Sequence, residues 1–277
     1  MGITRKVWIN YQDTPKIELT DPIAIVGSPG LRSVGKIAIE ALVEKLQPQL
    51  FAKLYSYGFP CIYYGPSYLE SPSHAGALIA KENLVELPHV AVYLLKNKNT
   101  AHAPSRDLVI VNGYQAYDAL NHYMVADKLT DLFIELNIKR IFSLGAQVIE
   151  EGVRCCATEV NLLEEMSRYG IEKTHVDRFI GFSGIVAAIG QEKGIQGVCL
   201  FSNTTQNLSD PEYPDYSAAK DLLEKVGEIL GLRVDTTDLE EKKRIEKALI
   251  KERMERESEE NMAETRKWSS EELSGYI

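Results

Sequence analysis

The chain has 277 residues, of which 44% are hydrophobic and 26% are charged, so it is long enough to bury the core of one large domain or two small ones. Its formal net charge of -9 argues against the phosphate backbone of a nucleic acid as the main partner, because that binding needs a surplus of Lys and Arg. The apolar runs have the length of strands, far below the roughly 20 residues of a membrane-spanning helix, and predict no membrane segment.

The cysteines indicate the compartment. There are four, Cys61, Cys155, Cys156 and Cys199, and none forms a C-x-x-C pair. Cys155 and Cys156 are adjacent, which is a poor arrangement for a disulfide. The residues after Met1 also lack the long apolar stretch of a secretory signal. We therefore expect reduced thiols and a cytoplasmic location.

Hydrophobic periodicity predicts strands that alternate with helices. Alternation of apolar and polar residues indicates half-buried strands, short continuous apolar runs indicate buried strands, and a 3.6-residue repeat indicates helices. In chain order the predicted elements are strands at Lys6–Tyr11, Lys16–Leu19 and Pro22–Gly27, a helix at Gly35–Leu46, strands at Leu50–Tyr57, Cys61–Tyr64, Ala77–Ala80, Val90–Leu95 and Leu108–Asn112, a helix at Tyr117–Leu136, a strand at Arg140–Leu144, helices at Glu159–Tyr169 and Ser183–Gln191, a strand at Gly197–Phe201 and a helix at Ser217–Leu230. This order predicts a mixed or largely parallel sheet covered by helices on both faces.

The composition changes after Val234. The stretch Leu239–Lys267 holds equal numbers of acidic and basic residues and a narrow row of apolar ones, which predicts a charged helical extension. Such a helix either lies solvated on the body or projects and packs in an oligomer, and the sequence leaves both open. We predict an α/β domain over residues 1–234, followed by a charged helix and a flexible C-terminal tail over residues 235–277.

The turn after the buried strand at Pro22–Gly27 invites comparison with a phosphate-binding loop. Gly30 to Lys36 has the pattern G-x-x-x-x-G-K, but Ile37 stands where that loop needs a Ser or Thr hydroxyl for magnesium. The G-x-G of a dinucleotide-binding turn is also missing. We expect a tight turn that joins strand to helix, with a binding surface as the remaining possibility, and no cofactor.

No other pattern predicts a catalytic or metal site. The five histidines have no partner at the spacing of metal ligands, and the G-x-S-x-G turn of a hydrolase is missing, the nearest stretch being Gly181 to Gly184. Pro211 to Tyr216 is a turn-rich acidic loop. We expect Asp215 to lie near the N-terminal end of the next helix, where a negative charge is favoured.

Four stretches together resemble one protein family. They are Ile25–Gly35, Ile180–Gly190, Gly194–Leu200 and Tyr213–Leu223. Their order and spacing are similar to those of the archaeal proteasome assembly chaperone family, the homologues of the second eukaryotic proteasome assembly chaperone, over about residues 21 to 232. The resemblance implies a three-layer α/β/α sandwich like that of nucleoside phosphorylases. It also implies homo-oligomers, core proteasome α-subunits as partners, a role without ATP, and no catalytic residues.

The family's partner-binding signature implies a site at the C-terminus. In the family, a hydrophobic residue, a tyrosine and a last residue with its carboxylate dock between α-ring subunits. Here Tyr276 and Ile277 hold the last two places, Gly275 stands where the hydrophobic residue belongs, and Leu273 lies two residues earlier. The glycine removes an apolar anchor of about 1.5 kcal/mol. The resemblance thus implies these four residues as a partner-binding site with weakened docking.

The residues and the resemblance together favour a binding protein over an enzyme. The main hypothesis is an ATP-independent proteasome assembly chaperone or proteasome-binding regulator. Two alternatives stay open, namely a phosphorylase-fold enzyme acting on a nucleoside-like small molecule and an oligomeric scaffold for another partner. An enzyme would show a pocket with convergent polar groups and at least one perturbed titrating residue.

Overall fold

The computed structural model describes residues 7–12, 18–57, 59, 78–79, 83–96, 106–114, 119–177, 181–205, 213–245 and 248. The chain divides into two units, Met1–Thr236 and Thr237–Ile277. In the second unit, residues 237–245 and 248 are helical, which agrees with the start of the predicted extension. The rest of the extension lies outside the described residues. The predicted boundary between residues 234 and 235 stays a prediction.

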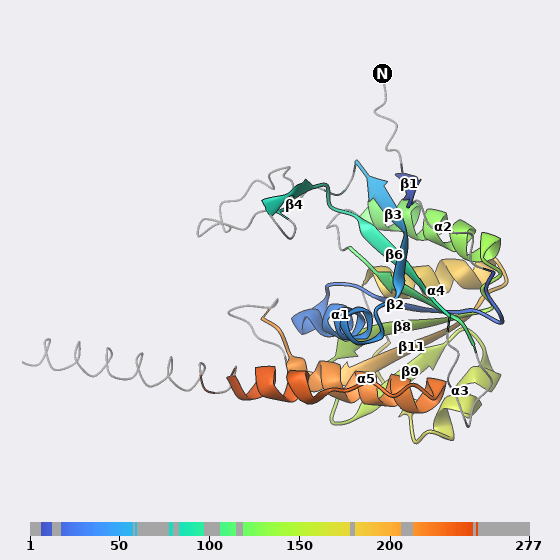
Figure 1. Cartoon of the computed structure of the whole chain (residues 1–277). Coiled ribbons are helices and arrows are strands. Elements are labelled where there is room, and N and C mark those ends of the chain that lie inside the picture. Colours follow the sequence, from blue (N-terminus) through green and yellow to red (C-terminus); the bar gives the residue numbers. More distant parts are fainter. Residues whose placement is uncertain are drawn as a thin grey trace, which may run out of the picture. The chain divides into compact units, whose positions relative to one another are not determined.

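A mixed nine-stranded sheet forms the centre of the first unit (Figure 1). In sheet order its strands are β1 (Val7–Tyr11), β3 (Gln49–Ser56), β6 (Val90–Leu95), β7 (Leu108–Asn112), β2 (Ile23–Gly27), β8 (Arg140–Gln147), β11 (Gln196–Asn203), β9 (Val153–Ala157) and β10 (Glu172–Lys173). The central strands β7, β2, β8 and β11 are parallel, whereas β6 and β9 join them antiparallel on either side. β4 (Leu78–Ile79) and β5 (Val85–Glu86) form a separate antiparallel pair.

Helices cover both faces of this sheet. On one face α1 (Val34–Leu46), which follows the short 3-10 turn η1 (Leu31–Ser33), packs beside α5 (Tyr216–Leu230), and on the other α2 (Ala119–Glu135) packs beside α4 (Phe182–Glu192). α3 (Val160–Ser167) packs on β9 and β10. The predicted three-layer α/β/α sandwich with a mixed sheet is therefore confirmed.

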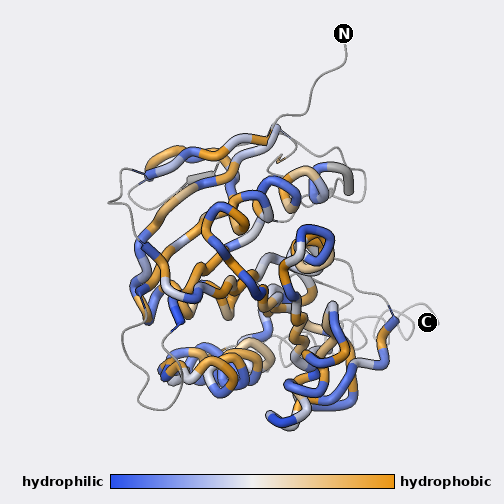
Figure 2. The backbone as a smooth tube through the Cα atoms, turned by 90° about the vertical axis from the view of Figure 1, so that its right-hand side faces the viewer, coloured by the Kyte–Doolittle hydropathy of each residue, from blue (hydrophilic) through white to orange (hydrophobic). Residues whose placement is uncertain are grey.

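The alternation along β2 explains the two layers. Ala24 and Val26 belong to the core cluster that includes residues of α2, whereas the Cβ direction of Gly27 points at Ile39 of α1. Every residue of β2 is buried, as expected for a parallel strand covered on both faces. Long hydrophobic stretches follow the strands, and the helices mix hydrophobic with hydrophilic residues (Figure 2). No described helix has the length and apolar character to cross a membrane.

Four strand assignments differ from the prediction. In the predicted strand Lys16–Leu19, the described residues Glu18 and Leu19 form no strand, so that prediction is wrong for this half. The chain there is held by Asp107 instead, whose Oδ2 accepts the Thr20 amide at 2.6 Å and whose amide donates to the Thr20 carbonyl at 3.1 Å. The sequence analysis missed β5, β9 and β10. The predicted strand at residues 61–64 lies outside the described residues.

Candidate protein-binding surface

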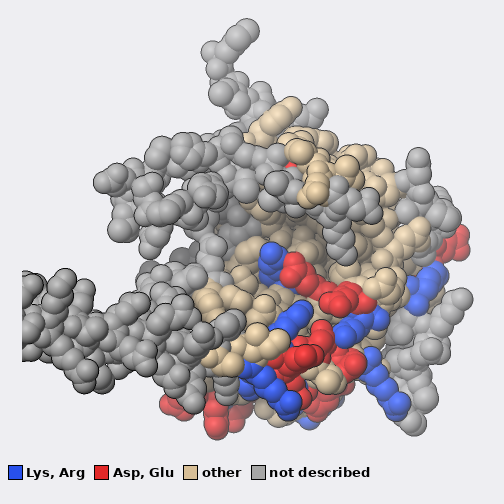
Figure 3. Space-filling view, turned by 60° about the vertical axis from the view of Figure 1, so that its left-hand side comes forward, with Lys and Arg blue, Asp and Glu red and all other residues tan. Residues whose placement is uncertain are grey.

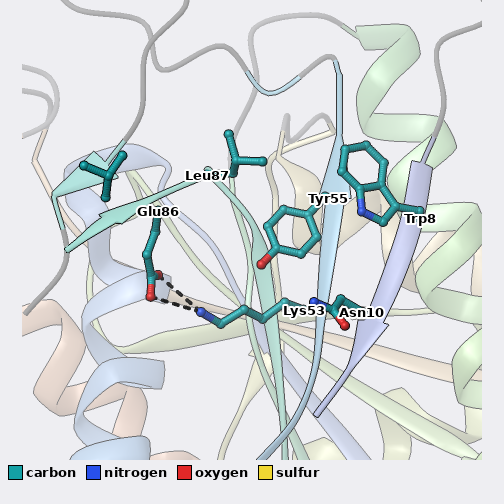
Figure 4. Close-up of a pocket in the computed structure, with 7 residues that line it drawn as sticks. Trp8, Asn10, Lys53, Tyr55, Glu86 and Leu87 are labelled. Carbon is teal, nitrogen blue, oxygen red and sulfur yellow. Dashed lines mark hydrogen bonds and ion pairs between the residues drawn. The ribbon is translucent and has the colours of Figure 1, made fainter.

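The sheet end formed by β1 and β3 leaves one face free of the helices in the described part of the chain. α2 packs on both strands from one side. On the other side Trp8 pairs with Tyr55 and Asn10 pairs with Lys53 in the strand register. Together with the segment at β5, these side chains enclose a hollow of about 360 Å³ (Figure 4). Its lining residues are Trp8, Asn10, Lys53, Tyr55, Val85, Glu86 and Leu87.

Aromatic rings gather around this hollow. The rings of Trp8 and Tyr55 are stacked, with centroids 5.5 Å apart and an angle of 19° between their planes. The Tyr57 ring lies 5.0 Å from Trp8, and the His89 ring lies 5.7 Å from Tyr55. The antiparallel register brings these side chains together, because directly opposite residues lie within contact distance on one face. Such rings offer large, rigid apolar area with a polar edge.

The polar groups at the hollow are bound to one another. Lys53 Nζ lies 3.3 and 3.2 Å from the two carboxylate oxygens of Glu86. His89 Nδ1 lies 2.8 Å from the Leu87 carbonyl oxygen, and burial lowers the pKa of His89. Burial, followed by the charges of Glu40 and Glu86, raises the pKa of Tyr93. The Lys53–Glu86 ion pair thus holds two opposite charges against each other beside the aromatic rings.

Large apolar side chains extend this surface outward. Tyr57 is 71% exposed and Val85 75%, and Leu84 and Leu87 are each more than half exposed. Exposed apolar residues that lie together indicate an interaction site, whereas single ones are ordinary. We name the set of Trp8, Tyr55, Tyr57, Leu84, Val85 and Leu87 the aromatic sheet face.

The surface over α1 and α5 has a different character. Lysines and acids alternate there in pairs such as Lys36 with Glu40 and Lys220 with Glu224, at 3.6 and 3.4 Å. Figure 3 shows positive and negative side chains intermixed in the lower half of the view. Exposed pairs of this kind add little stability and have no excess of positive charge, so this surface suits solvent better than a phosphate backbone.

The turn from Gly27 to Gly35 allows close packing between α1 and the sheet. A Cβ on Gly27 would lie 2.3 Å from the Gly35 carbonyl oxygen, and a Cβ on Gly35 would lie 2.4 Å from the Leu144 carbonyl oxygen. The two glycines thus let α1 approach β2 and β8 closely. Lys36, the basic residue of the G-x-x-x-x-G-K pattern, extends toward Glu40 on the exposed side of α1.

Arg32 closes this turn from the inside, a role that sequence reasoning missed. Arg32 is buried, with 8% of its surface exposed. The guanidinium donates to the carbonyls of Tyr213 and Pro214 and to the Thr205 hydroxyl, the last at 3.0 Å, and it lies 5.7 Å from the Tyr213 ring centre. These partners follow β11 and lie more than 170 positions away, so no local pattern could have identified them.

Asp215 has the predicted place at the start of α5. Its Oδ1 accepts the Ala218 amide at 3.0 Å, and its Oδ2 accepts the Thr204 hydroxyl at 2.6 Å. Its own amide donates to the Arg32 carbonyl at 3.0 Å. The expectation that this carboxylate serves the helix N-terminus is confirmed.

The predicted tail residues Leu273, Gly275, Tyr276 and Ile277 lie outside the described residues. Within the described part, no group of three or more His, Cys, Asp or Glu side chains is arranged to hold a metal ion. The aromatic sheet face was also missed from the sequence. Its signal was Trp8, an apolar ring at the outward position of an alternating strand.

Comparison with known proteins places the chain among relatives. The model of the PAC2 family matches residues 24–254. The chain belongs to the PAC2 family. This agrees with the resemblance found in the four sequence stretches, and the fold of solved members agrees with the sandwich described above.

Individual relatives are similar along most of their length. PbaB of Pyrococcus furiosus, an archaeal proteasome activator, is 30% identical, with a TM-score of 0.73 over 88% of this chain and 98% of that one. PbaA of the same organism, a homolog of proteasome-assembly chaperone, is 20% identical, with a TM-score of 0.65 over 88% and 95%. An uncharacterized protein of Methanocaldococcus jannaschii is 25% identical over 87% of this chain and 83% of its own length.

Proposed function

We propose that this chain is an ATP-independent proteasome assembly chaperone or proteasome-binding regulator, and that it acts by protein–protein contact without catalysis. The observation that carries this proposal is the likeness to PbaB, an archaeal proteasome activator, at 30% identity over nearly the whole of that chain. Membership of the PAC2 family supports it. The aromatic sheet face supports a binding role, because Trp and Tyr are enriched at protein interfaces.

The proposed partner is the core proteasome, through its α-subunits, and the proposed location is the cytoplasm. The C-terminal residues Leu273, Gly275, Tyr276 and Ile277 are the proposed end contact. Capture of a terminal carboxylate by lysine or backbone N–H groups is a known recognition mode. Gly275 supplies no apolar anchor and adds backbone freedom that must be lost on binding. A single tail therefore binds weakly.

Two features compensate for a weak tail. In the proposed homo-oligomer several tails act on one ring, which raises the effective concentration of each further tail. The aromatic sheet face adds broad apolar contact from the body. Its Lys53–Glu86 pair is already closed, so docking there leaves no buried charge without a partner.

The test measures binding of the full chain to an immobilised assembled proteasome α-ring by surface plasmon resonance. Deletion of Tyr276 and Ile277 should weaken binding. Gly275→Leu should strengthen it about tenfold, since about 1.5 kcal/mol of regained apolar contact corresponds to that ratio. Equal binding by wild type, deletion and Gly275→Leu would remove the tail as the recognition element.

The body contact has its own matched pair of variants. Tyr57→Ser and Val85→Ser change highly exposed side chains of the aromatic sheet face, and Tyr123→Ser changes a 57% exposed tyrosine on α2 as the control. We expect the first two to weaken ring binding and the control to leave it unchanged. If they instead dissociate the homo-oligomer in light scattering and leave ring binding intact, this face joins copies of the chain. If the ring is not bound at all, the proposed function fails.

A further inference from the structure

The sheet brings together two cysteines that lie far apart in the sequence. In the antiparallel register of β9 and β11, Cys156 is the direct partner of Cys199. Both side chains belong to a small apolar cluster with Phe201 and with Ala187 of α4, so both point to the same face. Among the described residues Cys155, Cys156 and Cys199 are free thiols.

The ladder fixes the separation of this pair. The Thr158 amide donates to the Gly197 carbonyl at 2.9 Å, and the Asn203 amide donates to the Gly152 carbonyl at 2.9 Å. Hydrogen-bonded pairs recur at every second residue of an antiparallel ladder, so the pair of Cys199 and Cys156 is also of this kind. Such pairs have Cα atoms about 5.5 Å apart, which lies within the range of about 4.4 to 6.8 Å for a disulfide, whereas their Cβ atoms, at about 5.5 Å, lie beyond the roughly 3.5 to 4.5 Å of an unstrained bond. Closing the bond therefore requires the two side chains to approach by about 1 Å, and the resulting strain makes it easily reduced.

The two thiols differ in ways that suit oxidation. A hydrogen bond from Cys199 lowers the pKa of Cys156, whereas that bond and burial raise the pKa of Cys199. Cys156 is half-buried and Cys199 is buried beneath α4. Cys155 provides the contrast, because it faces the other side of the strand and burial raises its pKa to about 11. Thiolate character and access select the cysteine that reacts first.

We propose that Cys156 and Cys199 form a reversible cross-strand disulfide when hydrogen peroxide oxidises the folded protein. The Cys156 thiolate attacks one peroxide oxygen, the O–O bond breaks, and the departing hydroxide takes a proton to leave as water. Cys199 sulfur then attacks the resulting sulfenic acid at Cys156, the S–O bond breaks, and a second water leaves with the Cys199 proton. The two sulfurs lose two electrons, and these reduce the peroxide. A dithiol reductant reverses the change by exchange.

The bond would close a loop that contains α3, β10 and α4. It would also tie the outer strands β9 and β10 to β11, the last of the parallel strands. Next to Cys199 on β8 is its register partner Ser143, whose hydroxyl donates to the Ser183 carbonyl in the first turn of α4. Oxidation would therefore constrain the contact between β8 and the first turn of α4, and it would constrain the sheet edge formed by β9 and β10.

The test treats the native full chain with hydrogen peroxide, blocks free thiols with N-ethylmaleimide and digests it with trypsin without reduction. The informative peptides are residues 155–168 and 194–220. We expect mass spectrometry to find them linked in wild type, Cys155→Ser and Cys61→Ser. No link should appear in Cys156→Ala or Cys199→Ala. The four thiols that Ellman's reagent counts in denatured wild type should fall to two and return to four after dithiothreitol.

Two further measurements keep the test decisive. Circular dichroism reports whether each variant is folded. If the buried substitution Cys199→Ala prevents folding, Cys156→Ala removes the same disulfide by changing the half-buried cysteine instead. The proposal is overturned if Cys155→Ser abolishes the link, if Cys156→Ala retains it, or if peroxide yields only sulfinic acid at Cys156. It is also overturned if the link forms only after unfolding in urea, since the native register would then not be its source.

Discussion

Replacing Gly35 by alanine sets two physical effects against each other at one position. Gly35 lies in the first turn of α1, where alanine is favoured over glycine by about 1 kcal/mol on helix propensity. The new Cβ, however, would lie 2.4 Å from the Leu144 carbonyl oxygen and 3.1 Å from its carbon. Ordinary contact begins at 3.4 Å, so the helix must move away from β8 by about 1 Å (3.4 minus 2.4).

The clash should outweigh the propensity. Overpacking a core costs typically about 1 to 3 kcal/mol, and the obstacle here is backbone, which cannot turn aside as a side chain does. With a backbone obstacle we take the upper end, about 3 kcal/mol, and subtracting the propensity gain of about 1 kcal/mol leaves a net destabilisation of about 2 kcal/mol. For a chain of this size that lowers the midpoint of thermal unfolding by about 4 to 8 °C. Differential scanning calorimetry and urea unfolding measure both quantities.

A neighbouring glycine supplies the control. The Cβ of Gly145→Ala would meet its nearest neighbour, the Phe201 ring, at 3.5 Å, which is ordinary contact. We expect this variant to unfold within about 0.5 kcal/mol of wild type. If Gly35→Ala is as stable as wild type, or more stable, then the close approach of α1 to β8 is not what requires glycine, and the reasoning is refuted.

Three further predictions follow from described side chains. Arg32→Lys should lower the free energy of unfolding in urea by about 2 kcal/mol, because lysine cannot reproduce the guanidinium's hydrogen bonds to two carbonyls. As the control, Arg168→Lys on the exposed surface should leave this free energy unchanged. The pKa of His89 is lowered in the folded state, so near pH 6.5 the unfolded state takes up a proton that the folded state does not. The free energy of unfolding, measured in urea, should therefore fall as the pH drops from 7.5 to 5, and it should fall less in His89→Gln. Isothermal calorimetry should detect no Mg-ATP binding, and tight binding abolished by Lys36→Ala would contradict this.

The sequence predicted the layers of the fold because those follow from local patterns. The run from Ile23 to Gly27 is short and apolar without alternation and ends in glycine, which is typical of a strand covered on both faces. Helices such as α5 carry their own stop signal, here Gly231 at a positive φ of 65°. β9 was missed because its residues include Arg154 and two cysteines, and its place is fixed by pairing with β11 rather than by its own propensity.

The candidate surface was harder to predict because it depends on register. Trp8 and Tyr57 are separated by 48 intervening positions, and only the pairing of β1 with β3 brings their rings to 5.0 Å. The same holds for Cys156 and Cys199, whose adjacency no spacing rule could give. A one-residue slip of either ladder would move the paired side chains to opposite faces.

The geometry around β2 bears on why a binding protein is the better interpretation of this fold. In open α/β sheets, the carboxyl ends of the parallel strands are where ligands bind, and the turn from β2 into α1 occupies that place. Here Gly27 and Gly35 draw the helix onto the strands, and Arg32 fills the inside of the turn with bonds to the chain's own carbonyls. The cationic side chain of this turn is thereby already bound within the protein. The broad apolar surface lies instead at the antiparallel end of the sheet, on β1 and β3 beside β5, and consists of rings and aliphatic side chains around the Lys53–Glu86 ion pair, which is the kind of surface that the proposed protein–protein contact needs.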